Sequence, residues 1–426
     1  MSLDTNNDLD VAKHLISEKP LFYYKQSFYE YNVNHWIPIS IRAVKRLILE
    51  VLGDKYKQTR VNNILDIMQL KTGKDVTDIN LHQKEKAINT KGGIYNWETK
   101  VLTPHNEKTM LLYATNIFNI NFKKDAKYNR WSQFVYEIFE KDEDKYDKVA
   151  LLQEFLGYCL TQDVSFQIAL LLLGNGSNGK SIIIQIMELI LGRENYSNIE
   201  LNQFSNKNYI VELLNKYVNF CSEIDHKTQF SSGTFKKIIT GDTLTGDRKF
   251  KDPIQFQAYC KLLFATNDLP ITNDTTKGYF RRLLILKFNR SFEGKEKDQN
   301  LLNELKGELD GIFNWLLEGL ERLYQNKKFT VPGSSIKEKE KYLETSNSVV
   351  SFIREKCELV NEQHEIYDDL FQEYRVFCAN SGDRPFKKMN FKNEIEKQFQ
   401  GKITFSRTGE KGNHFSGIKL KKEYGI

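Results

Sequence analysis

The stretch that most constrains this 426-residue chain is residues 169–191, ALLLLGNGSNGKSIIIQIMELIL. The apolar run Leu170 to Leu173 stops at Gly174, which is typical of a buried strand in a parallel sheet. After Ser181, apolar residues recur at helical spacing (Ile183, Ile186, Met187, Ile190 and Leu191). The stretch therefore predicts a strand, a tight glycine-rich turn and an amphipathic helix, which is the basic unit of an α/β fold.

The turn has the pattern G-x-x-x-x-G-K-S, formed by Gly174, Asn175, Gly176, Ser177, Asn178, Gly179, Lys180 and Ser181. Glycines let backbone N–H groups close around a phosphate, and the N-terminus of the next helix adds its dipole. Lys180 is expected to reach the β- and γ-phosphates of a nucleotide, and Ser181 is expected to bind Mg²⁺. A chance match on an ordinary strand-turn-helix is the alternative, and the complete pattern in this context disfavours it.

Two later apolar runs end in polar residues. The first, Tyr217 to Cys221, is followed by Glu223 and Asp225, and a carboxylate there can hold Mg²⁺ or orient an attacking water. The second, at 261–265, is followed by Asn267, whose amide can contact a γ-phosphate or that water. Because parallel strands end at one edge of a sheet, these groups are expected beside the phosphate-binding turn.

Two basic clusters are candidates for polyanion contacts. Arg281 and Arg282 precede a fourth apolar run and suit a charge clamp on a transferring phosphoryl group, although a pair of surface arginines is the alternative. Residues 235–258 predict a helix and a hairpin with a basic tip. Three lysines are candidates for DNA contacts, and a solvated turn is the alternative interpretation: the lysines are Lys237, Lys249 and Lys251.

The C-terminal region predicts a winged helix. Helices are expected at about 349–357, 367–380 and 388–399, followed by strands at 403–407 and 414–420. Residues 384–424 carry eleven Lys/Arg and four Asp/Glu, hence +7, against +6 for the whole chain. This charge favours a polyanion partner, with a solvated face as the alternative. The candidate DNA contacts are Lys387, Lys388, Lys392, Arg407 and Lys411.

Residues 1–150 contain no catalytic pattern. We expect little order in residues 1–20, two strands in 21–40, helices at 41–52 and 60–70, and a hairpin at 91–105. Tyr95 and Trp97 on that hairpin could stack nucleotides, although core packing is the commoner role of such aromatic residues. Further helices are predicted at 131–139, 149–160 and, as one long amphipathic helix, 301–323.

Composition excludes several classes of protein. No run of about 18 apolar residues is present, which argues against a membrane span, and the polar N-terminus is unlike a signal peptide. The five cysteines lack C-x-x-C spacing and are interpreted as reduced core thiols of a cytosolic protein without a metal framework.

Taken together, these residues resemble the superfamily 3 helicases, specifically the phage and plasmid primase-helicase family related to the poxvirus primase-helicase. The resemblance spans roughly residues 90–426 and includes the turn at 174–181, Glu223, the segment from Lys237 to Lys249, Thr266 to Pro270, and the arginine pair. It implies an AAA+ core that binds ATP and Mg²⁺ between the subunits of a hexameric ring around DNA. Asn267 would sense the γ-phosphate, and Arg281 or Arg282 would enter the neighbouring site.

One departure from the family concerns primer synthesis. No paired-carboxylate strand precedes the shared region, so we predict no primer synthesis and a separate primase or polymerase as partner. The expected domains are an α+β domain (1–125), a helical collar (126–166), the ATPase core (167–300), a helical lid and linker (301–344) and the winged helix (345–426).

The resulting hypothesis is an ATP-driven, ring-forming DNA helicase for a phage or mobile element, working in the cytoplasm of a bacterial host. Single-stranded DNA would occupy the pore, and duplex DNA the winged helix. The main alternative is an origin-binding initiator that ATP switches without processive unwinding. An RNA helicase and a DNA-packaging motor are further alternatives.

Overall fold

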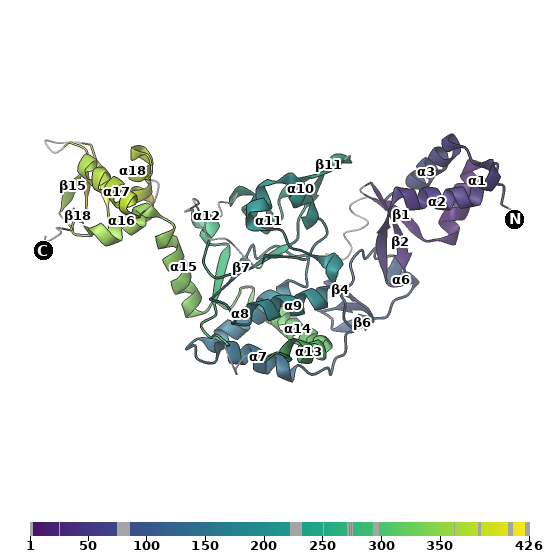
Figure 1. The fold of residues 1–426 in the computed structure, drawn as a ribbon, viewed down its shortest axis with the longest axis horizontal. Helices are drawn as coiled ribbons and strands as arrows, with labels where there is room; N and C mark the ends of the chain where they lie inside the picture. The colour runs from purple at the N-terminus through teal and green to yellow at the C-terminus, as the bar shows by residue number, and fades with distance from the viewer. Residues whose placement is uncertain are drawn as a thin grey trace.

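The structure is a computed structural model, and three parts follow one another along it (Figure 1). A helical module lies at the N-terminal end, a larger α/β part lies in the middle, and a small C-terminal module follows helix α15. The structure describes residues 3–24, 26–74, 86–221, 232–249, 251–270, 272, 274, 276–292, 298–361, 363–381, 385–407 and 412–421.

The central part contains a five-stranded parallel sheet in the order β13-β7-β12-β9-β8, which confirms the predicted parallel α/β core. Its strands are β7 (Ala169–Leu173), β8 (Tyr196–Ser197), β9 (Val218–Cys221), β12 (Lys261–Thr266) and β13 (Leu283–Lys287). From β7 the chain runs to the β8 edge, returns through β9 and β12, and then places β13 on the other side of β7. The winding direction therefore reverses beside β7, and ligands bind at the carboxyl ends of strands at such points.

Strand β7 contributes to two cores because its side chains alternate between the faces of the sheet. Leu170 and Leu172 belong to a core formed with α7 (Asn129–Phe139), α8 (Lys145–Tyr158), α9 (Lys180–Leu191) and α14 (Leu309–Asn326). Leu171 belongs to the opposite core, formed with α11 (Ser232–Thr240) and the hairpin of β10 (Thr243–Arg248) and β11 (Lys251–Gln257). Short helices α10 (Lys207–Ile210) and α12 (Lys277–Phe280) complete this part.

Helices α8 and α14 cross closely because glycines lie at the crossing. A Cβ on Gly157 would lie 2.3 Å from the carbonyl oxygen of Leu316, and one on Gly319 would lie 2.3 Å from that of Gln153. The amide of Gln153 also donates a 2.8 Å hydrogen bond to the Trp315 carbonyl. This crossing fixes the helical layer that covers one face of the sheet.

The prediction of one long helix over 301–323 is wrong. The chain forms α13 (Leu301–Lys306), breaks at Gly307 and Glu308, and resumes as α14. The Glu308 carboxylate accepts hydrogen bonds from the backbone N–H groups of Arg130 (3.1 Å) and Trp131 (2.9 Å), which caps the start of α7. A tertiary contact therefore interrupts a sequence pattern that is continuous.

The N-terminal module has its own core, built from α1 (Asp8–Glu18), β1 (Leu21–Tyr24), β2 (Ser27–Asn32), β3 (His35–Ile39), α2 (Ile41–Leu52) and α3 (Gln58–Thr72). The expectation of little order in residues 1–20 is wrong from Asp8 onward. The Asn7 side chain caps α1 by accepting from the Leu9 N–H at 2.9 Å, and Val11 and Leu15 are buried. Residues 21–40 form three strands rather than two.

A second small sheet, β4 (Ala87–Thr90), β5 (Gly93–Asn96) and β6 (Val101–Thr103), confirms the predicted hairpin and is followed by α6 (Glu107–Met110). Tyr95 is buried and stacks on Phe122 with ring centroids 4.1 Å apart, so core packing describes its role. Trp97 is half-buried and packs against Tyr324.

The C-terminal module follows α15 (Gly333–Thr345), and its three helices confirm the predicted positions: α16 (Ser348–Lys356), α17 (Tyr367–Ser381) and α18 (Lys388–Gln398). The predicted strand at 414–420 is interrupted at Gly417, whose φ is +91°. It forms β17 (His414–Ser416) and β18 (Lys419–Leu420), and β14 (Cys357–Glu358) and β15 (His364–Ile366) were not predicted. Strands β15, β17 and β16 (Thr404–Ser406) form one antiparallel sheet.

The side chains of all five cysteines are buried, as the sequence predicted. Within the described ranges, no helix combines the length and the apolar character that crossing a membrane requires.

Candidate functional site

Residues Gly174 to Ser181 connect β7 to α9, so the predicted strand, turn and helix are present. The Gly174 N–H donates to the carbonyl of Thr266 at 3.1 Å, which ties the start of the turn to the end of β12. A Cβ at Gly174 would lie 2.5 Å from the Asn178 amide nitrogen and 2.6 Å from the Phe288 carbonyl oxygen. Only glycine fits this position, and the turn lies at the carboxyl edge of the sheet beside its winding reversal.

The backbone of the turn presents its N–H groups without using them. The backbones of Ser177 (φ +58°) and Gly179 (φ +88°) adopt the left-handed conformation. Gly176, which precedes Ser177, and Asn178, which lies between the two, do not. Alternation of this kind makes a concave nest of N–H groups that binds anions. In the part of the chain that the structure describes, the backbone N–H groups of residues 175–179 have no hydrogen-bond acceptor. The geometry therefore fits a phosphate.

Lys180, the first residue of α9, is buried with 7% of its surface exposed. Its ammonium group donates to the Gly174 carbonyl and, at 3.0 Å, to the side-chain oxygen of Asn178. Both acceptors are neutral, no carboxylate among the described residues pairs with this lysine, and burial lowers its pKa. A phosphate in the nest would supply the missing negative charge. Ser181 is exposed beside it.

A segment that no sequence pattern indicated supports the turn from outside. The N–H of Phe288 donates to the Leu173 carbonyl at 2.7 Å, and the N–H of Phe292 donates to the Ser177 carbonyl at 2.7 Å. Arg290, between them, donates to the Glu140 carboxylate at 2.8 Å, which anchors the segment beside α7. Residues 288–292 thereby fix the shape of the nest. The apolar run 283–288 predicted β13 but gave no sign of this contact.

The structure places Asn267 beside the turn, at the carboxyl end of β12. Thr266 is paired with Leu173, so Asn267 follows the strand end level with Gly174, and its side chain is exposed. Strand β9 ends at Cys221, which pairs with Phe264. Glu223 and Asp225 lie outside the described residues.

Arg281 and Arg282 lie at the opposite edge of the sheet from the phosphate-binding turn of their own chain. Leu283, directly after them, is paired with Ala169 at the amino end of β7. Arg281 is exposed. Arg282 is 9% exposed, and burial together with the charge of Arg281 lowers its pKa. The structure therefore does not bring the arginine pair together with the turn within one subunit.

The predicted hairpin after α11 is present as β10 and β11, paired from Thr243 with Gln257 to Arg248 with Lys251. Lys249 is exposed at its tip, and Lys237 is exposed on α11. Lys251 begins β11, and its side chain is not among those described. The basic tip is therefore at the far end of a two-stranded arm rather than at the phosphate-binding turn.

The predicted DNA contacts of the C-terminal module divide into two groups. Lys388 forms an ion pair with Asp368, and Lys392 lies 3.3 Å from the Glu396 carboxylate, so local acids partly neutralise both. A second group is exposed, consisting of Lys387 at the start of α18 and Arg407 after β16. Lys411 lies outside the described residues.

Comparisons with known proteins divide the chain into two matched regions. The family described as "D5 N terminal like" matches residues 13–140, and a family of unknown function (DUF5906) matches residues 172–282. The second region includes the phosphate-binding turn, Asn267 and both arginines of the pair.

The curated relatives are viral proteins. The chain is 25% identical over 335 residues to "Putative helicase L207/L206" of Acanthamoeba polyphaga mimivirus, covering 66% of this chain and 34% of that protein. It is 20% identical over 363 residues to "Putative primase C962R" of African swine fever virus (isolate Warthog/Namibia/Wart80/1980), covering 78% of this chain and 37% of that protein. The chain thus spans about a third of the length of these relatives.

Solved structures share the fold over nearly the whole chain. The apo structure of the NrS-1 C terminal region (305-718) has a TM-score of 0.56 at 13% identity, covering 97% of this chain and 99% of that one. A second apo form of the same region has a TM-score of 0.55 and covers 97% of this chain and 100% of that one, again at 13% identity. This similarity shows a shared fold, and the relation to viral helicase and primase proteins rests on the curated relatives.

Proposed function

We propose that this protein is an ATP-dependent, ring-forming DNA helicase of the AAA+ superfamily 3 type that serves replication of a phage or mobile element. The observation that carries the proposal is the nest of unused N–H groups at 175–179 with the buried Lys180 at its base. The sheet order and the names of the viral relatives, helicase and primase, support it.

A nucleoside triphosphate fits the turn. The N–H groups of residues 175–179 would bind its phosphates, and Lys180 would neutralise charge on the β- and γ-phosphates. Ser181 and Glu223 would hold Mg²⁺, which when bound stabilises negative charge on the transferring phosphoryl group. The geometry of Lys180 suits this role because a hydrogen bond to Asn178 already holds its ammonium at the base of the nest.

Two further groups would act on water and γ-phosphate. Asp225 with Glu223 would orient the attacking water, and Asn267 at the end of β12 would contact the γ-phosphate. Asn267 lies level with the first residue of the turn, which supports its assignment.

The arginine pair would complete the site of a neighbouring subunit. Because Arg281 and Arg282 lie at the sheet edge away from their own turn, a role within one subunit is disfavoured. Head-to-tail contact around a ring would place the arginine edge of one subunit against the phosphate edge of the next.

DNA contacts are assigned to two places. Lys237, Lys249 and Lys251 on and beside the hairpin would contact single-stranded DNA in the pore. The C-terminal module would bind duplex DNA as a winged helix, with Lys387 and Arg407 as its exposed cations.

The second candidate function is an origin-binding initiator in which ATP only sets the oligomeric state. The exposed C-terminal cations favour duplex binding in either case. The arm with a basic tip favours the helicase, since a pure switch requires no loop in a pore.

The proposal is tested by measuring ATP hydrolysis with and without nucleic acid. The wild-type protein should hydrolyse ATP, and single-stranded DNA should stimulate it more than RNA of the same sequence. Lys180→Ala should abolish hydrolysis, because no other cation of the turn reaches the nest, whereas alanine at the exposed Lys277 should not. Hydrolysis by Lys180→Ala at the wild-type rate would refute the site assignment.

A further inference from the structure

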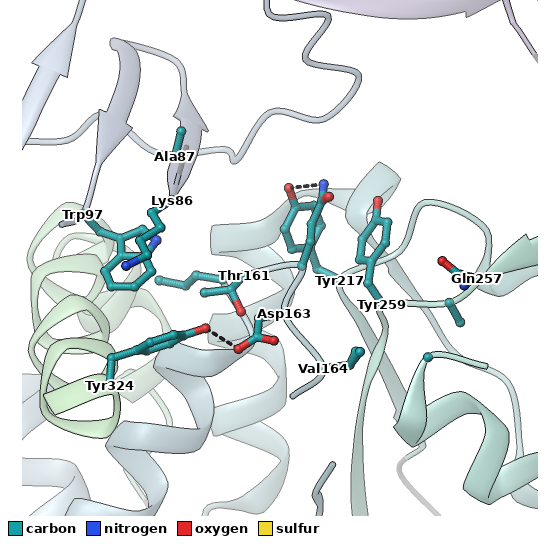
Figure 2. A pocket seen from close by; sticks show the side chains of 14 residues that line it. Lys86, Ala87, Trp97, Thr161, Asp163, Val164, Tyr217, Gln257, Tyr259 and Tyr324 are labelled. Carbon is teal, nitrogen blue, oxygen red and sulfur yellow. Dashed lines mark hydrogen bonds between the residues drawn. The ribbon is translucent and has the colours of Figure 1, made fainter. Parts of the chain in front are cut away.

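A cavity of about 430 Å³ lies at the amino edge of the central sheet, on the side away from the phosphate-binding turn (Figure 2). Tyr217, directly before β9, and Tyr259, two residues before β12, line it. Gln257, the last residue of β11, is also in its lining, so the cavity lies at the base of the basic hairpin. The proposed ATP site uses none of these residues.

Aromatic side chains face the cavity from two sides. Figure 2 shows Trp97 and Tyr324 on one side and Tyr217 and Tyr259 on the other, with Asp163 between them. The rings of the first pair have centroids 4.7 Å apart, and those of the second pair 5.4 Å apart. Such ring walls bind flat, unsaturated groups by stacking.

Hydrogen bonds hold two of these four rings, those of Tyr324 and Tyr217, in place. The Tyr324 hydroxyl donates to the Asp163 carboxylate at 2.6 Å, and the Gln162 amide donates to the Tyr217 hydroxyl at 3.2 Å. Asp163 in turn accepts from the N–H and the hydroxyl of Ser165, both at 2.8 Å. The walls are therefore preorganised, which lowers the ordering cost of binding.

Polar and cationic groups at the rim complement the rings. Gln257 is exposed there, and a carboxamide offers a donor and an acceptor to the edge of a heterocyclic base. Lys86 lies with its ammonium 5.4 Å from the Trp97 ring centroid. A neighbouring cavity of about 620 Å³ shares Lys86, Trp97 and Tyr324, and its lining includes Lys100, Lys327, Glu98 and Glu321. Lys86 forms an ion pair with Glu98, and Lys100 forms one with Glu321. Lys327 is exposed and has no carboxylate partner among the described residues, so a cation beside the aromatic walls suits an anionic backbone that carries bases.

We propose that this cavity binds a nucleobase, and that it receives one base of the single strand that passes the hairpin. The second part rests on the proposed helicase function, whereas base binding does not. A purely apolar ligand fits less well, because Gln162, Asp163 and Gln257 would remain beside it as polar surface. A free nucleotide and a nucleotide within a strand present the same base to the cavity. The test therefore uses a separate probe for each of these two ligands.

The test measures binding of fluorescein-labelled dT12 by anisotropy in the full-length protein without ATP. Tyr259→Phe retains the ring and should bind as the wild type does. Tyr259→Leu keeps apolar volume but removes the ring, and it should weaken binding by about 5- to 150-fold, the usual range for loss of one base stack. Tyr146→Leu, at a tyrosine that is 71% exposed on α8, is the matched control and should bind dT12 as the wild type does.

Two additions keep the test decisive. If Tyr259→Leu melts below the assay temperature, Gln257→Ala at the exposed rim replaces it, with an expected loss of about 2- to 10-fold for one hydrogen bond. Titration with dTMP is done in Lys180→Ala, so that the phosphate-binding turn does not contribute. Loss of dTMP binding in the Lys180→Ala, Tyr259→Leu double variant would identify a free nucleotide as occupant and still support a base site.

Two outcomes overturn the inference. Two results together would show that no base stacks there: wild-type affinity of Tyr259→Leu for dT12, and equal dTMP binding by Lys180→Ala and the double variant. If Lys249→Ala still weakened dT12 binding, the proposed function would stand. Failure of the wild-type protein to bind either probe would overturn the base site, and failure to bind any DNA would overturn the proposed function with it.

Discussion

The arginine pair provides the sharpest prediction about how subunits cooperate. Five residues of β7 at about 3.3 Å each separate the level of Leu283 from that of Gly174, so the pair begins about 16 Å from its own phosphate-binding turn. An extended arginine side chain does not cover that distance. We therefore predict that Arg281 and Arg282 act on the neighbouring subunit, and that the double alanine variant loses about 10³–10⁵ in turnover.

Mixing two inactive variants measures this arrangement. Lys180→Ala lacks the turn lysine, and Arg281→Ala/Arg282→Ala lacks the pair. In rings assembled at random from equal amounts, about one quarter of head-to-tail interfaces would join an intact turn to an intact arginine pair. The ATPase rate of the mixture should therefore recover to about a quarter of the wild-type rate.

The matched control is a mixture of Lys180→Ala with Glu223→Gln. The proposed function assigns both residues to the phosphate side of the interface, so every site in a mixed ring would retain one defect and no recovery is expected. If the arginine mixture also fails to recover, although native mass spectrometry finds mixed rings, the reasoning from the sheet edges is refuted.

Four other predictions concern the proposed site, the hairpin, the C-terminal module and the helix crossing. Glu223→Gln should retain ATP binding, measured by calorimetry, but stop turnover, because we assign the carboxylate to water and metal; a wild-type rate would reject its role. Lys249→Ala with Lys251→Ala should reduce strand displacement far more than ATP hydrolysis, and unchanged displacement would make the hairpin a solvated turn. Deleting the C-terminal module after α15 should leave a folded ATPase that binds duplex DNA weakly. Its affinity should also depend less on salt, since each neutralised phosphate contributes about 0.9 to the slope of log affinity against log salt concentration. An unchanged slope would exclude this module as the DNA anchor. Gly319→Ala should lower the free energy of unfolding by about 1–3 kcal/mol, because the added Cβ would lie 2.3 Å from the Gln153 carbonyl oxygen. Gly333→Ala, whose Cβ would have nothing within 4 Å, should change that free energy by about 0.5 kcal/mol or less. Equal melting temperatures of the two variants would contradict the close crossing.

The glycine-rich turn at 174–181 and the strands beside it were predictable because their residue types are required locally. The glycines follow from the needs of a tight turn, and the apolar runs of β7, β9 and β12 follow from burial on both faces of a parallel sheet. The helix of residues 41–52 was predicted to the residue, since Ser40 caps its start and Gly53 ends it.

Features that depend on distant contacts were not predictable. Glu308 breaks the helical pattern of 301–323 because its carboxylate caps α7, whose residues are more than 170 positions away in sequence. The support of the turn by residues 288–292 uses backbone N–H groups, which leave no residue pattern. The cavity at the hairpin base combines seven separate stretches of the chain. The sequence offered Trp97 as a candidate for stacking nucleotides, but no pattern placed Tyr217, Tyr259 or Tyr324 beside it.

Strand displacement on a forked DNA substrate measures directly whether this protein is a helicase. The wild-type protein should separate the strands only with ATP and Mg²⁺, and Lys180→Ala and the Arg281→Ala/Arg282→Ala variant should separate none. Binding of the fork and hydrolysis of ATP without any strand separation would contradict the helicase assignment and favour the ATP-switched initiator.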